Sequence, residues 1–283
     1  MKYMLALGLI ASLPFAAAAQ KLHGDLYLGA ANYQGDLQTK RVTLQGAKPA
    51  VGLGLSYDIS NHFIARTAFS FMQVTGDDKR NTTKQGNTAR NLNFKTNILE
   101  GQLGVEYNIL DLTNHSLTPY VFAGVAVFHY DPFTFDSAGT KVFLQPLGTE
   151  GQGLSLYPDR KLYKKTDFAI PFGGGLKLAL SDRLQVGVEL GLRKLFTDYL
   201  DDVSTTYADS AALFAGRGAQ AVELSYRGDE IKGGVGYPAA GTQRGSAKYK
   251  DWYYTTGFRI SYLFGGGNGG GRKTKTGCPV NVY

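Results

Sequence analysis

The stretch KYKDWYYTTGFRISYLF, residues Lys248–Phe264, decides the fold. From Trp252 onward its even positions are almost all aromatic or aliphatic, whereas its odd positions include Thr255, Gly257 and Arg259. This period of two predicts a β-strand with one apolar face, a pattern that soluble sandwiches share. The length of the apolar face and the aromatic residues at both of its ends are typical of strands that cross an outer membrane. We therefore interpret this stretch as the closing strand of a membrane β-barrel.

Seven other segments carry the same strand signal. They are about Leu22–Gln34, Lys48–Ser60, Phe63–Gly76, Leu92–Ile109, Pro119–Tyr130, Asp167–Leu180 and Arg183–Thr197. The fifth contains YVFAGVAVFHY and is apolar at both alternating sets of positions, so the pattern leaves its outward face undecided. The linkers after the second, fourth and sixth segments are short, and the others are longer and polar. Because outer-membrane barrels have short periplasmic turns and long external loops, we predict an all-β, eight-stranded antiparallel transmembrane barrel with both termini in the periplasm.

The N-terminal residues are typical of a secretory signal peptide. Residues 1–19, MKYMLALGLIASLPFAAAA, contain one basic residue, an apolar core and small residues at Ala17 and Ala19 before Gln20. The apolar core is too short to span a membrane as a helix. The expected division is a signal peptide at 1–19, a barrel at 20–264 and a flexible tail at 265–283.

In several predicted strands, charged residues occupy the positions that alternate with those of the apolar face. Those assigned to the lumen are Asp25, Arg66, Glu100, Glu106, Lys177, Glu189, Arg193 and Arg259. An eight-stranded barrel is just wide enough for its own side chains to fill it. Four positive and four negative groups in so narrow a space predict a salt-bridged, closed interior, in preference to a proton or ion path.

The C-terminal tail begins with GGGNGGG, residues 265–271, which is typical of a flexible linker. Arg272, Lys273, Lys275 and Cys278 follow it, and Cys278 is the only cysteine of the chain. No internal disulfide is therefore possible, and an odd cysteine in an exported protein suggests an intermolecular bridge or a spare thiol. We hypothesise that these four residues bind a periplasmic partner; a leftover without a role is the alternative.

Catalytic and metal-binding motifs are missing from the sequence. There is no nucleophile elbow, zinc-protease motif or phosphate loop, and the four histidines, His23, His62, His115 and His129, lie in separate segments. Acidic loops can bind calcium, but the spacing of Asp198, Asp201, Asp202 and Asp209 matches no defined calcium loop. We therefore expect no cofactor, no metal and no enzymatic activity, with a lipid-modifying enzyme as a minor alternative. The net charge of +7 is spread along the chain, which argues against nucleic-acid binding.

Three stretches stand out together: FAIPFG at Phe168–Gly173 with Gly175, FTDYLDDVS at Phe196–Ser204, and DWY at Asp251–Tyr253 after Arg244 and Gly245. In combination they resemble the PorG-like family of small outer-membrane barrels in Bacteroidetes. The resemblance implies a non-enzymatic component of the type IX secretion system that associates with a periplasmic ring of a lipoprotein and its partner. Basic residues near the outer rim are expected to contact outer-membrane lipids and lipopolysaccharide. A general structural or adhesion barrel is the alternative function.

Overall fold

The computed structural model describes residues 21–38, 40, 43–80 and 89–265. Eight strands form the wall of a barrel: β1 (Leu22–Gln34), β2 (Lys48–Asp58), β3 (Phe63–Asp77), β4 (Asn93–Asn108), β5 (Leu117–Phe135), β7 (Thr166–Ala179), β8 (Leu184–Leu195) and β9 (Trp252–Phe264). Each strand pairs antiparallel with its neighbours, and β4 pairs with β5. The short β6 (Lys141–Phe143) extends the sheet beside the last residues of β5.

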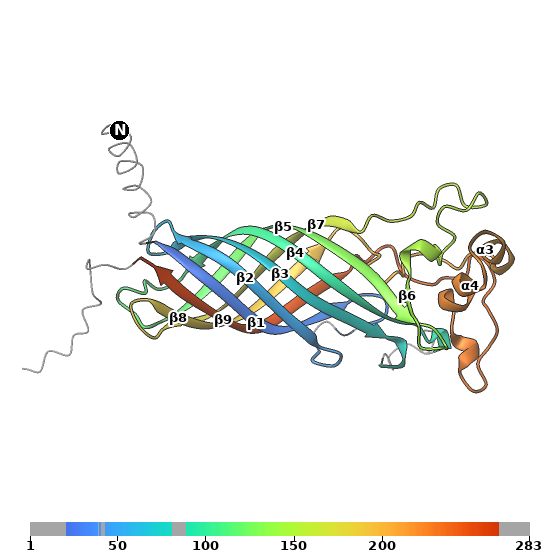
Figure 1. Cartoon of the computed structure of the whole chain (residues 1–283), viewed down its shortest axis with the longest axis horizontal. Helices are drawn as coiled ribbons and strands as arrows, with labels where there is room; N and C mark the ends of the chain where they lie inside the picture. The colour runs from blue at the N-terminus through green and yellow to red at the C-terminus, as the bar shows by residue number, and fades with distance from the viewer. Residues whose placement is uncertain (1–20, 39, 41–42, 81–88, 266–283) are drawn as a thin grey trace, which may run out of the picture.

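The opening and closing strands complete the ring (Figure 1). Leu22 of β1 lies opposite Phe264 of β9, and Gln34 lies opposite Trp252, so the two strands pair along their whole length. Both ends of the described chain therefore lie at one end of the barrel, together with the short turns between β2 and β3, β4 and β5, and β7 and β8. We call this the turn end; the opposite end, where the long connections lie, is the loop end.

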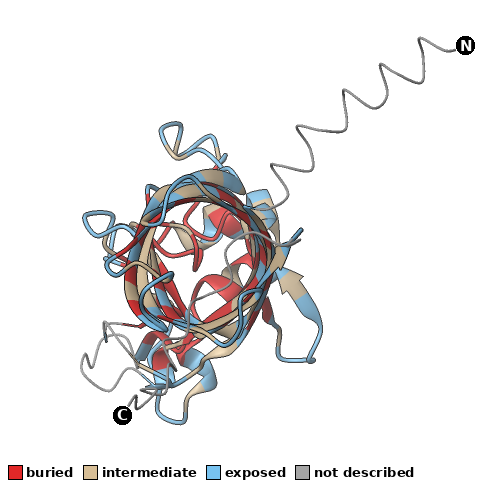
Figure 2. Cartoon of the chain, turned by 90° about the vertical axis from the view of Figure 1, so that its left-hand side faces the viewer, coloured by how far each residue is buried: buried red, intermediate tan, exposed pale blue. Residues whose placement is uncertain are grey.

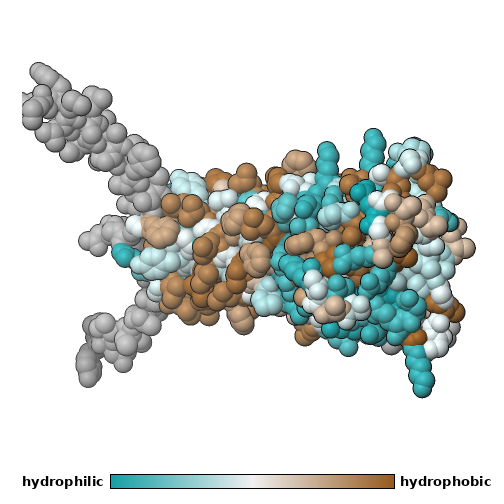
Figure 3. Space-filling model, turned by 45° about the vertical axis from the view of Figure 1, so that its right-hand side comes forward, coloured by the Kyte–Doolittle hydropathy of each residue, from teal (hydrophilic) through white to brown (hydrophobic). Residues whose placement is uncertain are grey.

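The outer face of the barrel is apolar. Leu53 and Phe258, for example, have exposed fractions of 68% and 65%. The space-filling view shows apolar residues over the barrel wall and polar residues toward the loop end (Figure 3). Water would not favour so wide an exposed apolar surface, whereas the hydrocarbon of a bilayer would. Because a closed barrel leaves no unpaired edge in the membrane, the fold is that of an integral outer-membrane protein.

The prediction of eight antiparallel strands is confirmed, and the structure decides the face of the fifth. In β5, Tyr120, Phe122 and Phe128 are buried inside the barrel, while Val121 and Val125 are exposed outside. None of the helices among the described residues is long and apolar enough to cross a membrane.

Close packing between β1 and β9 depends on two glycines that face each other. A methyl group added at Gly257 would lie 2.4 Å from the carbonyl oxygen of Leu28 and 2.5 Å from the Cα of Gly29. Gly29 and Gly257 are paired in the register of the two strands. A side chain at either position would push the closing strand away from β1, so the seam requires glycine.

The sequence-based strand boundaries lie within two residues of those in the structure, except at two strand ends. The closing strand begins at Trp252 instead of Lys248, and β5 continues to Phe135. The connection between β8 and β9 contains two short helices that the sequence analysis missed, α3 (Ser210–Arg217) and α4 (Ala219–Ser225). The N-cap of α3 is Asp209, whose carboxylate accepts a hydrogen bond from the amide of Ala212. Helices of eight and seven residues carry too few periodic positions to stand out in an Ala- and Gly-rich segment.

Candidate functional site

The lumen near the turn end is filled by a network of charged side chains. Glu106 is at its centre, with ion pairs to Lys177, Arg259 and Arg66, the last at 3.5 Å between Nη1 and Oε2. Arg66 Nη1 also donates to Glu189 Oε2 at 2.9 Å, and Arg259 Nη2 donates to Asp25 Oδ2 at 2.8 Å. All six side chains come from different strands, so the network connects the wall across the lumen.

A second, smaller group of charges lies farther toward the loop end. Arg193 donates two hydrogen bonds to Glu100, at 3.3 Å and 3.1 Å, and a third to Thr255 at 2.8 Å. Tyr253 donates its hydroxyl to the same carboxylate at 2.5 Å. The structure thus places the eight charged residues assigned to the lumen inside the barrel, in two separate groups. Their charges balance, so the interior attracts neither cations nor anions strongly.

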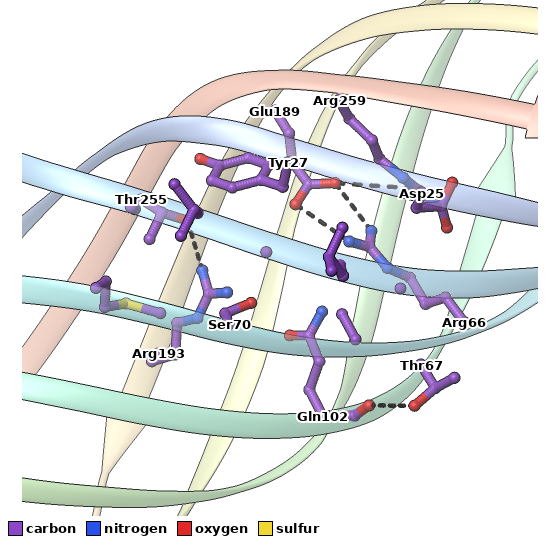
Figure 4. Close-up of a pocket in the computed structure, with 17 residues that line it drawn as sticks. Asp25, Tyr27, Arg66, Thr67, Ser70, Gln102, Glu189, Arg193, Thr255 and Arg259 are labelled. Atoms are coloured by element: carbon purple, nitrogen blue, oxygen red, sulfur yellow. Dashed lines mark hydrogen bonds and ion pairs between the residues drawn. The ribbon is translucent and has the colours of Figure 1, made fainter.

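A small internal cavity separates these two groups (Figure 4). Its volume is about 30 Å³, and Arg66, Arg193 and Glu189 are among its lining residues. Two buried atoms at this level, the hydroxyl of Tyr27 and Oε1 of Gln102, have no hydrogen-bond partner among the described residues. A polar cavity of this size can hold water, but it is too small for a solute.

Apolar side chains close the lumen at the loop end. The buried cluster includes Tyr33 and Ile98 from the wall and Leu200 and Val203 from the segment after β8. Seen from the turn end, the inside of the barrel is lined with buried residues (Figure 2). The ring of Tyr163 stacks on that of Tyr199 with centroids 4.7 Å apart. A continuous water-filled path through the barrel is therefore blocked both by the charge network and by this core.

The long connections at the loop end are joined by buried polar contacts, and we call this assembly the loop cap (residues 35–47, 78–92, 136–165 and 196–251, where described). Arg244 donates to Glu150 Oε1 at 3.1 Å and lies 3.7 Å from Asp202 Oδ2. Glu150 also accepts from the amides of Ser204 and Thr205, at 2.9 Å and 3.1 Å.

The other two connections join the loop cap through Arg90. This residue forms two 2.8 Å hydrogen bonds with Asp78, and it donates to the carbonyl oxygens of Arg244 and Asp36. All four long connections are thus held together by buried arginines. Sequence reasoning named Arg244 only as part of the family resemblance and did not single out Glu150, Arg90 or Asp78, because no local pattern marks residues whose partners lie far away in the chain.

The aspartates of FTDYLDDVS are buried in the loop cap. Tyr33 donates to Asp201, and Tyr163 donates to Asp202 Oδ1 at 2.7 Å. Burial raises the pKa of Asp202 to about 6, although the nearby Arg244 favours its ionised form. Burial and the carboxylate of Asp36 raise the pKa of Asp201 well above its usual value. These residues pack the cap. No group of three or more His, Cys, Asp or Glu side chains that could hold a metal ion exists among the described residues.

Asp198 is the most unusual member of this group. Its Oδ2 accepts a hydrogen bond from Ser204 at 2.7 Å, whereas its buried Oδ1 has no partner among the described residues. Burial raises the pKa of Asp198 to about 7, with a further contribution from Asp36. Asp251 lies in the same acidic surroundings, where burial and the charge of Asp201 raise its pKa well above its usual value.

A polar cavity opens at the turn end, and we call it the vestibule. Its volume is about 600 Å³, and its lining includes His23, Asp58, Asp111, Asp182 and Lys177. His62 and His115 belong to the turns β2–β3 and β4–β5, and His129 is exposed on the outer face of β5, so the four histidines do not converge. The proposed partner-binding residues Arg272, Lys273, Lys275 and Cys278 lie outside the described residues.

A sequence comparison places the N-terminal half of the chain in a known family. Residues 2–145 match the family described as "Domain of unknown function (DUF6089)". The chain belongs to the DUF6089 family. No functionally curated protein matches this DUF6089 member.

Several solved outer-membrane barrels are similar to this DUF6089 chain. Neisserial surface protein A is 9% identical, with a TM-score of 0.41 over 86% of this chain and 97% of that one. The attachment invasion locus protein Ail of Yersinia pestis is 9% identical, with a TM-score of 0.40 and the same coverage. OprG of Pseudomonas aeruginosa is 12% identical, with a TM-score of 0.40 and again the same coverage.

Proposed function

We propose that this protein is a non-enzymatic outer-membrane component of a type IX protein secretion machine, in which it anchors a periplasmic ring that contains a lipoprotein. The observation that carries the structural part of the proposal is the closed lumen. Glu106 and its three basic partners fill one half, and the apolar core with Tyr33 and Leu200 fills the other. A barrel without a path for solutes is suited to hold a machine in the membrane.

The assignment to type IX secretion is supported by the resemblance of FTDYLDDVS and its companion stretches to PorG-like barrels. In this protein Asp201 and Asp202 of that motif are packing residues of the loop cap, because both are buried and hydrogen-bonded. The motif therefore supports the assignment as a family signature and supplies no active site.

The proposed orientation places the turn end in the periplasm. The short turns lie there, which is the usual arrangement in outer-membrane barrels. The vestibule and the basic tail with Cys278 would then face periplasmic partners. At the other side, lysines such as Lys95 and Lys141 lie beside exposed Phe135 and Phe143, where they would meet lipopolysaccharide phosphates. No nucleic acid is among the proposed partners.

The test is co-purification from detergent-solubilised outer membranes, followed by mass spectrometry, together with secretion assays in a deletion strain. We expect a periplasmic lipoprotein and its partner to co-purify, and we expect secretion to fail in the strain. Deletion of residues 266–283 should reduce recovery of these partners while the barrel still inserts. Normal secretion in the deletion strain would refute the proposal.

A general structural or adhesion barrel is the second candidate. Its support is the loop cap, which is tightly packed yet exposes Phe214 and Val235, with exposed fractions of 60% and 65%. These apolar side chains at the loop end are available for contact with a partner outside the membrane. Loss of envelope integrity or adhesion without a secretion defect would favour this candidate, and altered lipid A in the same strain would indicate a lipid-modifying enzyme.

A further inference from the structure

Five side chains near the loop end form a cluster of basic and aromatic groups, which we call the rim patch. It consists of Lys95 of β4, Phe133 and Phe135 of β5, and Lys141 and Phe143 of β6 (Figure 1). In the strand register Phe133 lies opposite Lys95 on one side and opposite Phe143 on the other. Phe135 lies opposite Lys141. Paired residues, and residues two apart in one strand, point to the same face of a sheet, so the five side chains share one face.

This face is the outer face of the barrel. Val125 and Val127 occupy the same set of alternating positions in β5 as Phe133, and both are exposed on the outside. Farther along β5 the outer surface becomes polar at Asp131, which pairs with Lys165 at 3.2 Å. The rim patch lies beyond this change, at the level where a bilayer passes from hydrocarbon to headgroups and where aromatic belts occur.

The two lysines of the rim patch lie over aromatic rings, and neither is paired with a carboxylate in the part of the chain that the structure describes. Nζ of Lys141 is 3.9 Å from the ring centroid of Phe133 and 4.6 Å from that of Phe143. Nζ of Lys95 is 5.0 Å from the ring centroid of Phe135. An aromatic ring positions a cation without neutralising its charge, so the ammonium groups remain available to an anion. The rim patch is therefore complementary to phosphate, which lysine commonly binds.

An apolar groove crosses the outer wall of β2, β3 and β4, and we call it the wall groove. Its volume is about 630 Å³, and the side chains that line it on the outer face include Leu53, Phe69 and Leu103. Gly101 also lines the groove and lies opposite Phe69 in the register. A methyl group added at Gly101 would have no atom within 4 Å. The groove is thus open where β4 lacks a side chain.

The wall groove lies at the depth that a lipid chain from the rim patch reaches. Lys95 and Gly101 both belong to β4, and the six residues between them correspond to about 20 Å along the strand. Because the strands of such barrels tilt by about 35–45°, the groove lies about 15 Å deeper in the membrane than the patch. The hydrocarbon of one leaflet is also about 15 Å thick, half of the bilayer core.

We propose that the rim patch and the wall groove together bind one phosphorylated, acylated lipid of the outer leaflet, of the lipid A class. Lys95 and Lys141 bind its phosphate, and the wall groove holds the end of one acyl chain. The exposed rings of Phe135 and Phe143 contact the part of the lipid between them. This site rests on the proposed function for its orientation, which puts the loop end in the outer leaflet. The bound lipid has a fixed place on the wall, unlike lipids that exchange freely around the barrel.

The test is a titration of the purified protein in detergent micelles with bisphosphorylated lipid A, followed by native mass spectrometry. We expect Lys95→Gln/Lys141→Gln to weaken binding by about 25-fold, because each lysine near anionic headgroups contributes about a fivefold factor in affinity. Gly101→Leu fills the wall groove and should weaken binding several-fold although the charge is unchanged. Dephosphorylated lipid A should bind the wild type about as weakly as the phosphorylated lipid binds the lysine variant.

Two matched variants control for charge and for bulk. Lys194→Gln removes an exposed lysine from the loop end of β8, a strand that does not pair with β4, β5 or β6. Ala123→Leu adds bulk at an exposed position of β5 outside the wall groove. Both should bind lipid A as the wild type does.

Binding by Lys95→Gln/Lys141→Gln as tight as by Lys194→Gln would overturn the proposal. Binding by Gly101→Leu as tight as by Ala123→Leu would overturn it as well, because the groove would then hold no part of the lipid. No secretion partner is present in this titration, so its outcome is independent of the secretion assay. Normal secretion in the deletion strain would refute the secretion role and leave the lipid titration unchanged.

Discussion

Arg244 donates a hydrogen bond to Glu150 at 3.1 Å although 94 residues separate them in the sequence. The pair joins the connection between β5 and β7 to the one between β8 and β9. Both side chains are buried, and burial is least costly for charges that are paired in this way. The long connections therefore behave as parts of one structure, which we expect to open cooperatively.

Replacement of Arg244 by Met should destabilise the loop cap by about 3–5 kcal/mol, because it leaves the buried carboxylates of Glu150 and Asp202 without their cation. Hydrogen exchange of residues 199–247 measures the effect and should become much faster. The barrel wall should keep its slow exchange, since its hydrogen bonds do not involve Arg244. Lys248→Met, at an exposed position of the same connection, is the control and should have little effect. Unchanged exchange in Arg244→Met would show that the pair does not hold the cap.

The loop cap should become less stable as pH rises through neutrality. The folded-state pKa of Asp198 is raised to about 7, above the usual 3.8, so folding favours the protonated form. The corresponding stability is fully present below about pH 4 and is lost as pH rises toward 7. One proton linked to opening changes the opening constant by up to about tenfold per pH unit. Hydrogen exchange of the cap, corrected for the intrinsic rate, measures this dependence between pH 5 and 8.

Asp198→Asn is the informative variant, because its amide imitates the neutral acid. Its cap should be more stable than the wild-type cap at pH 8, and its pH dependence should be weaker. Asp36, Asp201 and Asp251 lie nearby. Part of the pH dependence of cap stability should remain in the variant, because Asp201 and Asp251 also have raised pKa values. Asp159→Asn removes one exposed carboxylate from another connection and should follow the wild type. If the cap of Asp198→Asn lost stability more steeply with rising pH than the wild-type cap, the pH dependence would not be due to Asp198.

The sequence was sufficient to predict the barrel because each strand carries its own signal. In β9, alternation alone separates Phe258 and Ile260 on the lipid side from Arg259 inside, and strand pairing then follows from the order of turns. The loop cap depends on contacts that no local pattern reveals. Glu150 stands in a glycine-rich stretch and Arg244 in an irregular one, and only the folded chain brings them together. The lumen residues were predictable as a set, but their partners were not, because partner choice depends on the shear of the closed barrel.

The lumen pair Arg193 and Glu100 should be strongly coupled. Arg193→Met leaves the carboxylate of Glu100 buried with only the hydroxyl of Tyr253, so we expect a loss of about 3–5 kcal/mol in unfolding free energy. In the double variant Arg193→Met/Glu100→Met no charge is left unpaired, and the loss should be smaller than in the single variant. Urea unfolding from lipid vesicles measures all three proteins. Additive losses would show that the two side chains do not act as a pair.

The apolar face of β9 should tolerate charge least near the middle of the strand. Phe258 is paired with Leu28 on one side and Val188 on the other, and its ring is 65% exposed on the outer face. An arginine near the bilayer midplane of such a barrel costs about 2–4 kcal/mol, whereas one near the interface costs about 0–1 kcal/mol. Phe258→Arg should therefore lower the unfolding free energy in vesicles by the larger amount. Tyr249→Arg, at a similarly exposed aromatic position before the strand begins, should leave it almost unchanged. Equal effects of the two substitutions would mean that Phe258 does not face the hydrocarbon and that the membrane position inferred from the apolar face is wrong.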